Sequence, residues 1–228
     1  MPLQARDPKQ SLFGQAWLYR TQIYLFLLFC IFIFSCAPKP SISRELVTVY
    51  STSAAEPWLP LLYDCAGSLV PLSRVDSPRG ADIALRVGEP EFLDMPAFQI
   101  DSEEILIVTH RQSPLQNLTF EEARSLFTGQ GDLSIEVWVY ASGEDVQEVF
   151  DRVVMAGRRV TPSARIAIHP QQMSDTLVNE SSSVGILPRH WKVGDVREIF
   201  TVAAVPVLAI TQVEPQGAIR ELIACLQK

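Results

Sequence analysis

The stretch of residues 114–129 constrains the fold most, because it combines a strand end, a capped helix and a helix stop. The apolar run Ile105–Thr109 before it predicts a strand. Thr119 and Glu122 form a capping-box pattern, in which each side chain satisfies a backbone amide of the first helical turn. Gly129 follows as the residue that ends the helix. One face of this predicted helix is apolar and consists of Phe120, Ala123, Leu126 and Phe127.

Strand patterns and helix patterns alternate along the rest of the chain. Predicted helices follow Pro57, the turn at 141–145 and Pro170, and the last helix is expected to start near Pro215. This alternation predicts an α/β protein with mixed sheets flanked by helices. The predicted strands cover residues 46–50, 69–72, 82–85, 98–100, 104–109, 135–140, 164–168, 184–188 and 206–211.

The composition fits a packed globular protein and argues against nucleic-acid binding. The 228 residues are 47% hydrophobic and 20% charged, and the formal net charge is −7. Neutralising nucleic-acid phosphates requires clustered Lys and Arg side chains, and the sequence contains no such basic stripe.

Residues 1–35 have the pattern of a signal peptide. Basic residues precede the apolar run Ile23–Phe34, which is short for a membrane span but typical of a secretory leader. Ser35 and Cys36 then resemble a bacterial lipobox, in which the cysteine is lipidated after cleavage. The alternative is an uncleaved anchor helix that starts near Leu18. The lipoprotein interpretation predicts lipidation at Cys36, a tether over residues 36–43, and a location on the extracytoplasmic face of the cell membrane.

Two cysteines remain in the predicted mature chain, Cys65 near its start and Cys225 near its end. Outside the cytoplasm, such a pair is typical of a disulfide. Two buried free thiols are the alternative, and the sequence alone does not decide between them.

The segment order resembles that of the substrate-binding proteins of phosphate ABC transporters, a group of type II periplasmic binding proteins. Those proteins carry an apolar strand, a break, Leu-Thr or Leu-Ser, an acidic helix and Phe-x-Gly, as residues 105–129 do here. Gly-Ala-Asp-Ile at 80–83 and the segment Val184–Pro188 are similar to two further family strands.

This resemblance implies a monomer with two lobes that close on a ligand. Residues 44–108 plus 190–228 would form lobe 1, and residues 109–189 would form lobe 2. Residues 191–200 are expected to bridge the return of the chain to lobe 1.

The resemblance also places ligand-binding turns beyond the carboxyl ends of strands. In lobe 1, the turn of Ser51, Thr52 and Ser53 offers three hydroxyls to a tetrahedral oxyanion. The alternative is that Ser53 only caps the next helix, in a capping box with Glu56. A second alternative puts Pro57 at the first helical position, with Glu56 as the cap.

In lobe 2, the corresponding turn contains Ser142 and Gly143, both expected at the ligand. Related proteins have Gly-Ser-Gly-Thr there, whereas Glu144 stands here in place of the hydroxyl residue. Glu144 and Asp145 satisfy the positive end of the following helix and would repel a dianion, which argues against phosphate as the specific ligand.

Two further side chains are candidates for the cleft. Arg86 ends the strand at 82–85 and is the expected cationic partner of an anion, with a solvated surface arginine as the alternative. Tyr140 ends the strand at 135–140 and is expected to direct its hydroxyl into the cleft, unless it only closes the strand.

The sequence gives no support for catalysis or for a metal. The three histidines, His110, His169 and His190, are isolated, and neither zinc-binding spacings nor a nucleophile elbow occur. We therefore expect no enzyme activity, no metal and no cofactor.

The predicted function is that of an extracytoplasmic solute-binding lipoprotein, which captures a small, phosphate-like oxyanion between its lobes and presents it to an ABC permease. The alternative keeps the fold but has a degenerate pocket. In that case the lipoprotein would act as a sensor or as a protein-interaction module.

Overall fold

The computed structural model describes residues 46–68, 70–132 and 134–228. The predicted signal peptide, the tether at 36–43 and the lipidation site Cys36 lie outside the described residues. Within the described ranges, no helix has both the length and the apolar character needed to cross a membrane.

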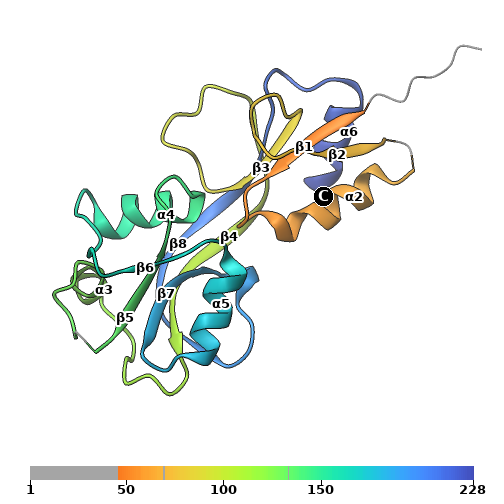
Figure 1. Ribbon diagram of the computed structural model, residues 1–228. Helices are drawn as coiled ribbons and strands as arrows, with labels where there is room; N and C mark the ends of the chain where they lie inside the picture. The colour runs from red at the N-terminus through yellow and green to blue at the C-terminus, as the bar shows by residue number, and fades with distance from the viewer. Residues whose placement is uncertain (1–45, 69, 133) are drawn as a thin grey trace, which may run out of the picture. The chain divides into compact units, whose positions relative to one another are not determined.

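Eight strands form one sheet in the order β2-β1-β3-β8-β4-β7-β5-β6 (Figure 1). Antiparallel pairs lie in the middle of the sheet, and parallel pairs lie towards both edges. The strands are β1 (Val47–Ser51), β2 (Leu72–Arg74), β3 (Ile83–Val87), β4 (Ala97–His110), β5 (Glu136–Tyr140), β6 (Arg165–Ala167), β7 (Ser183–Pro188) and β8 (Val196–Ile210).

The two long strands β4 and β8 run antiparallel through the middle of the sheet and belong to both halves of it. At one end β8 pairs with β3, and at the other end β4 pairs with β7. The prediction of separate strands at 98–100 and 104–109 is therefore wrong, because β4 is continuous. The last strand, predicted at 206–211, begins earlier, because β8 starts at Val196 within the segment 191–200 that was predicted to bridge the return of the chain.

We call the half that contains β1, β2 and β3 lobe 1, and the half that contains β5, β6 and β7 lobe 2. The lobe boundaries at 108/109 and 189/190 stay predictions, because β4 and β8 contribute to both halves. The mixed sheet and the helices that flank it agree with the predicted α/β class.

Helices cover both halves of the sheet. The α-helices are α2 (Leu59–Ala66), α3 (Phe120–Phe127), α4 (Asp145–Phe150), α5 (Pro170–Asn179) and α6 (Gly217–Leu226). Shorter turns of helix are η1 (Glu56–Trp58), the π-helical η2 (Asp151–Met155), which continues α4, and η3 (Arg189–Trp191).

The capping box at the start of α3 is confirmed. The Thr119 hydroxyl accepts from the Glu122 amide, and the Glu122 carboxylate accepts from the Thr119 amide at 2.7 Å. The equivalent prediction for Ser53 and Glu56 is wrong: η1 has Ala55 as its N-cap and no side-chain cap. The second alternative is right in part. Pro57 lies in the first helical turn, where a backbone amide would have no helical partner, but Glu56 is the first residue of η1 rather than its cap.

The core is continuous through both lobes and lies between the sheet and its helices. In lobe 2, the rings of Phe127 from α3 and Phe150 from α4 pack with centroids 4.6 Å apart, and both side chains are fully buried. Each large apolar side chain buried in this way contributes roughly 1.5–3 kcal/mol.

Cys65 and Cys225 form a disulfide between α2 and α6, with Cα atoms 5.9 Å apart. The two helices lie side by side in lobe 1 (Figure 1). Of the two alternatives that the sequence left open, the structure therefore has the disulfide.

Candidate functional site

The turn after β1 and the start of α4 meet across the space between the lobes. The Thr52 hydroxyl donates a hydrogen bond of 2.6 Å to Oδ2 of Asp145, and the Val87 amide at the end of β3 donates to the same oxygen at 2.9 Å. The Asp145 side chain is buried, with 3% of its surface exposed. Two hydrogen-bond donors from lobe 1 thus bind one carboxylate oxygen of lobe 2.

A second and a third contact lie beside the first. The Ser53 hydroxyl approaches Oε2 of Glu144 at 3.4 Å. The guanidinium of Arg86 pairs with the Glu148 carboxylate of α4 at 2.8 Å, and its Nε donates to the carbonyl of Gly88. We call the groups Thr52, Ser53, Arg86, Val87, Glu144, Asp145 and Glu148 the interlobe contact.

Close approach of the backbone supports the same contact. Gly88 follows β3 with φ at +76°, and a Cβ atom there would lie 2.8 Å from a methyl carbon of Val149 in α4. Only glycine adopts this conformation without strain and leaves room for the helix. The loop after β3 therefore packs directly against α4.

Burial raises the pKa of the Asp145 carboxyl, and the hydrogen bonds from Thr52 and Val87 together with the charge of Arg86 offset this only in part. Burial also raises the pKa of Glu144, and the neighbouring Asp145 charge adds to that rise. Both ionised carboxylates thus stand in surroundings that favour their neutral forms.

Tyr140 ends β5 beside these carboxylates. Its side chain is 3% exposed, and its hydroxyl has no hydrogen-bond partner among the described residues. Burial raises its pKa well above the ordinary range, and the charges of Asp145 and Glu144 add to this. Its amide donates to the buried Gln147 side chain, which fixes the end of the strand to α4.

The other predicted ligand residues flank this contact, since Ser51 and Gly143 are the chain neighbours of Thr52 and Glu144. Ser51 is buried, and its hydroxyl donates to the carbonyl of Thr52. Ser142 is exposed and lines a cavity of about 340 Å³ together with Tyr140, Arg158 and Arg159. Gly143 adopts a φ of +94° in the turn before α4.

The structure thus brings three of the predicted residues, Thr52, Ser53 and Arg86, to the interlobe contact, and it places Tyr140 and Ser142 on the lining of one cavity. Thr52 and Ser53 bond to Asp145 and Glu144, which the sequence analysis had assigned to the start of the following helix, whereas Arg86 pairs with Glu148. The sequence analysis missed Glu148 and the Val87 amide. The available signal was the pair Glu144-Asp145 in the turn after the strand that ends at Tyr140, but the pair alone did not reveal its partners.

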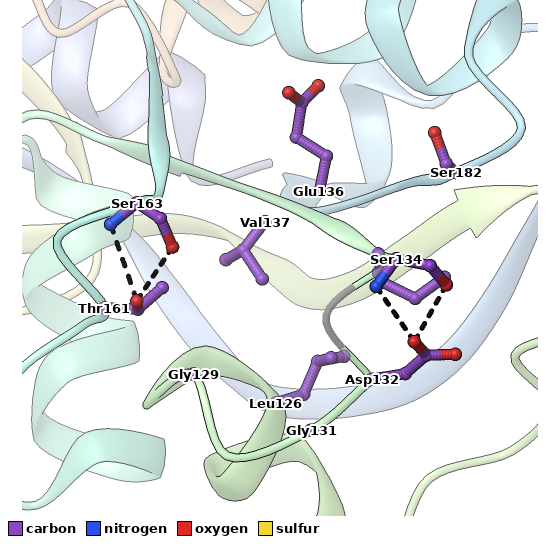
Figure 2. A pocket seen from close by; sticks show the side chains of 11 residues that line it. Leu126, Gly129, Gly131, Asp132, Ser134, Glu136, Val137, Thr161, Ser163 and Ser182 are labelled. Carbon is purple, nitrogen blue, oxygen red and sulfur yellow. Dashed lines mark hydrogen bonds between the residues drawn. The ribbon is translucent and has the colours of Figure 1, made fainter.

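A polar cavity of about 370 Å³ lies near the amino end of β5, away from the interlobe contact (Figure 2). Figure 2 shows Thr161 bonded to Ser163 on one side, and Asp132 bonded to Ser134 on the other. The bonds from Ser134 hold the pKa of Asp132 below its usual range.

The histidines have local partners. His110 and His169 each accept a backbone amide at Nδ1, and His169 thereby caps α5. His190 lies 2.8 Å from the buried Glu103 carboxylate and packs against the Trp58 ring. Among residues 46–68, 70–132 and 134–228, no group of three or more His, Cys, Asp or Glu side chains could hold a metal ion.

Neither a protein-family model nor a curated protein sequence matches the chain. Several solved structures, however, match the chain in fold. A substrate-binding protein assigned to phosphate ABC transport, from Clostridium perfringens with bound phosphate, aligns with a TM-score of 0.70 at 14% identity. The alignment covers 80% of this chain and 93% of that protein. An ABC-type phosphate transport receptor from Vibrio cholerae aligns at 0.62 and 19% identity, over 81% and 94% of the two chains.

The chain has a type II periplasmic-binding-protein fold. The same fold occurs outside transport proteins: the regulatory domain of CcmR from Synechocystis PCC6803, in complex with 2-PG, aligns at a TM-score of 0.58 and 11% identity. That alignment covers 80% of this chain and 95% of the domain. Both binding proteins and regulators are thus similar to this chain in fold, and at these identities the similarity extends to the fold alone.

Proposed function

We propose that the chain is a lipid-anchored, extracytoplasmic protein of this fold that acts as a sensor or protein-interaction module rather than as a carrier of a free oxyanion. The observation that carries the proposal is the Asp145 carboxylate, which already accepts from Thr52 and Val87. The donors that would hold an oxyanion in lobe 1 are therefore engaged.

Electrostatics support the same proposal. Glu144, Asp145 and Glu148 bring three carboxylates to the contact, and Arg86 is the one cation paired there among the described residues. A dianion entering this space would meet these like charges at short range, and the repulsion would be strongest at the buried Asp145, which is shielded from water.

A second candidate is solute capture for an ABC transporter. It is supported by the two phosphate-transport proteins that share the fold, one of which holds phosphate. In this case the lobes would open, Asp145 would leave Thr52, and a small solute would take its place. A permease and an ATPase encoded beside this chain would favour this candidate, and a sensor kinase there would favour the first.

A thermal-shift series distinguishes the two. The protein is heated with inorganic phosphate, sulfate, molybdate or a panel of neutral solutes, at matched ionic strength. A solute at 100 times its Kd would stabilise the fold by about 2.7 kcal/mol and raise the midpoint by several degrees. We expect no shift with any of these solutes. A phosphate-specific shift would refute the first candidate and support the second.

The proposed anchor has its own test. Expressed in a bacterial host and fed labelled palmitate, the chain is expected to incorporate the label and to fractionate with membranes, because Cys36 follows the lipobox-like sequence. Cys36→Ser should lose the label, whereas Cys30→Ser should keep it. Label retained in Cys36→Ser would contradict lipidation at this residue.

A further inference from the structure

The interlobe contact has the geometry of a ligand site that is already filled. Oδ2 of Asp145 accepts from an O–H group at 2.6 Å and an N–H group at 2.9 Å, both from lobe 1. Charge-assisted hydrogen bonds of this length are the ones that proteins use to hold carboxylate and phosphate oxygens. Its other oxygen, Oδ1, accepts from the Val146 amide of its own helix at 2.9 Å.

The donors do not depend on Asp145 for their positions. Thr52 is held by the sheet, since its amide donates to the Leu85 carbonyl of β3. The Ala55 amide in turn donates to the Thr52 hydroxyl oxygen at 3.3 Å, which leaves the hydroxyl proton directed elsewhere. Val87 is the last residue of β3 and is fully buried. The lobe 1 half of the site is therefore preorganised.

We propose that Asp145 is an internal ligand, and that its carboxylate competes with a free oxyanion of the phosphate or sulfate class for the Thr52 hydroxyl and the Val87 amide. This inference rests on the proposed function, in which the cleft is closed by the chain itself. Removing the carboxylate vacates the donors and removes one negative charge, while Arg86 stays beside them. The chain should then gain an affinity for oxyanions that the unmodified chain lacks.

The experiment is a calorimetric titration of the full chain in a mild detergent with inorganic phosphate, and separately with sulfate. Asp145→Ala should bind phosphate at least about tenfold more tightly than the unmodified chain, because the Asp145 carboxylate, which fills the site most of the time, is absent. Asp145→Ser serves as a second vacating variant that keeps a polar group for the Val146 amide. Cooperative unfolding of each variant is verified first.

Three controls isolate the mechanism. Asp145→Asn keeps an acceptor oxygen of the same shape and should bind no better than the unmodified chain. Glu91→Ala removes an equal charge from an exposed position outside the contact and should also show no gain. Thr52→Val, added to Asp145→Ala, removes one of the two donors and should abolish the gained affinity.

The outcomes separate this inference from the proposed function. No gain in either folded vacating variant would overturn the internal ligand and leave the proposed function standing. A gain that persists with Thr52→Val, or that Glu91→Ala reproduces, would also overturn it. If the unmodified chain itself binds phosphate and Asp145→Ala binds it more tightly, the proposed function fails and the competition by Asp145 stands.

Discussion

The disulfide between Cys65 and Cys225 should supply a large part of the stability of the fold. The two residues lie 160 positions apart, so the bond closes most of the described chain into one loop. In the chain-entropy model, a loop of this length restricts the unfolded state by about 5 kcal/mol at 25 °C, and removing native disulfides typically costs about 2–5 kcal/mol. Because domains of this size have total stabilities of roughly 5–15 kcal/mol, the loss should be easy to measure.

The assay is urea unfolding followed by circular dichroism. The double variant Cys65→Ser/Cys225→Ser should have a free energy of unfolding about 2–5 kcal/mol lower than the oxidised chain. Its m-value should be somewhat larger, because the unfolded chain without the bond is less compact. The unmodified chain under reducing conditions should match the double variant, which controls for the serine substitutions.

Equal urea midpoints for the double variant and the oxidised chain would contradict this prediction. An unchanged midpoint of the unmodified chain on reduction would contradict it as well, because either result would mean that the bond does not restrict the unfolded state.

Three further predictions concern the interlobe contact, the loop after β3 and the N-terminus of α3. Because burial raises the pKa of Asp145 and Glu144 on folding, these carboxyls stabilise the fold at acidic pH, and this stabilisation is lost as pH rises through their folded pKa values. In thermal melts between pH 4.5 and 8, the midpoint of Asp145→Asn should therefore depend less on pH than that of the unmodified chain. An equal pH dependence of the two midpoints would contradict this. Gly88→Ala should lower the free energy of unfolding by about 1–3 kcal/mol in urea titrations, because the new Cβ atom meets Val149 and because alanine is strained at the positive φ of this position. An unchanged free energy of unfolding would show that α4 can move away. Thr119→Ala should lower the free energy of unfolding by about 1 kcal/mol in the same assay, and Thr119→Ser is the matched control that keeps the capping hydroxyl. Equal losses in the two variants would contradict the capping role.

Local patterns predicted the parts of the fold that depend on neighbouring residues. The capping box of Thr119 and Glu122 is a contact over three positions, so the sequence contains all of it. The alternation of apolar strands and helices likewise predicted the α/β class. The same kind of pattern failed at Ser53 and Glu56, because Ser53 faces Glu144 from the other lobe, 91 positions away.

The extent of the long strands could not be predicted from side-chain patterns. Residues 101–104 are polar and interrupt the apolar alternation, yet β4 continues through them because β8 supplies backbone partners, for example Val205 opposite Glu103. Backbone pairing of this kind depends on the partner strand rather than on the local side chains. The interlobe contact was hidden for the same reason: Thr52 and Asp145 are 93 positions apart.

The central claim is that Asp145 binds to the donors of lobe 1, and a double-mutant cycle with Thr52 tests it most directly. Unfolding free energies are measured for Thr52→Val, Asp145→Ala and the double variant. We predict a favourable coupling of about 1.5–3 kcal/mol, the usual contribution of a hydrogen bond to a charged group. The matched cycle of Thr48→Val with Asp145→Ala should be additive within about 0.3–0.5 kcal/mol, because Thr48, four positions before Thr52 along the chain, bonds through its hydroxyl to Asp82 and shares no partner with Asp145. Additivity in the Thr52 cycle as well would contradict the claim.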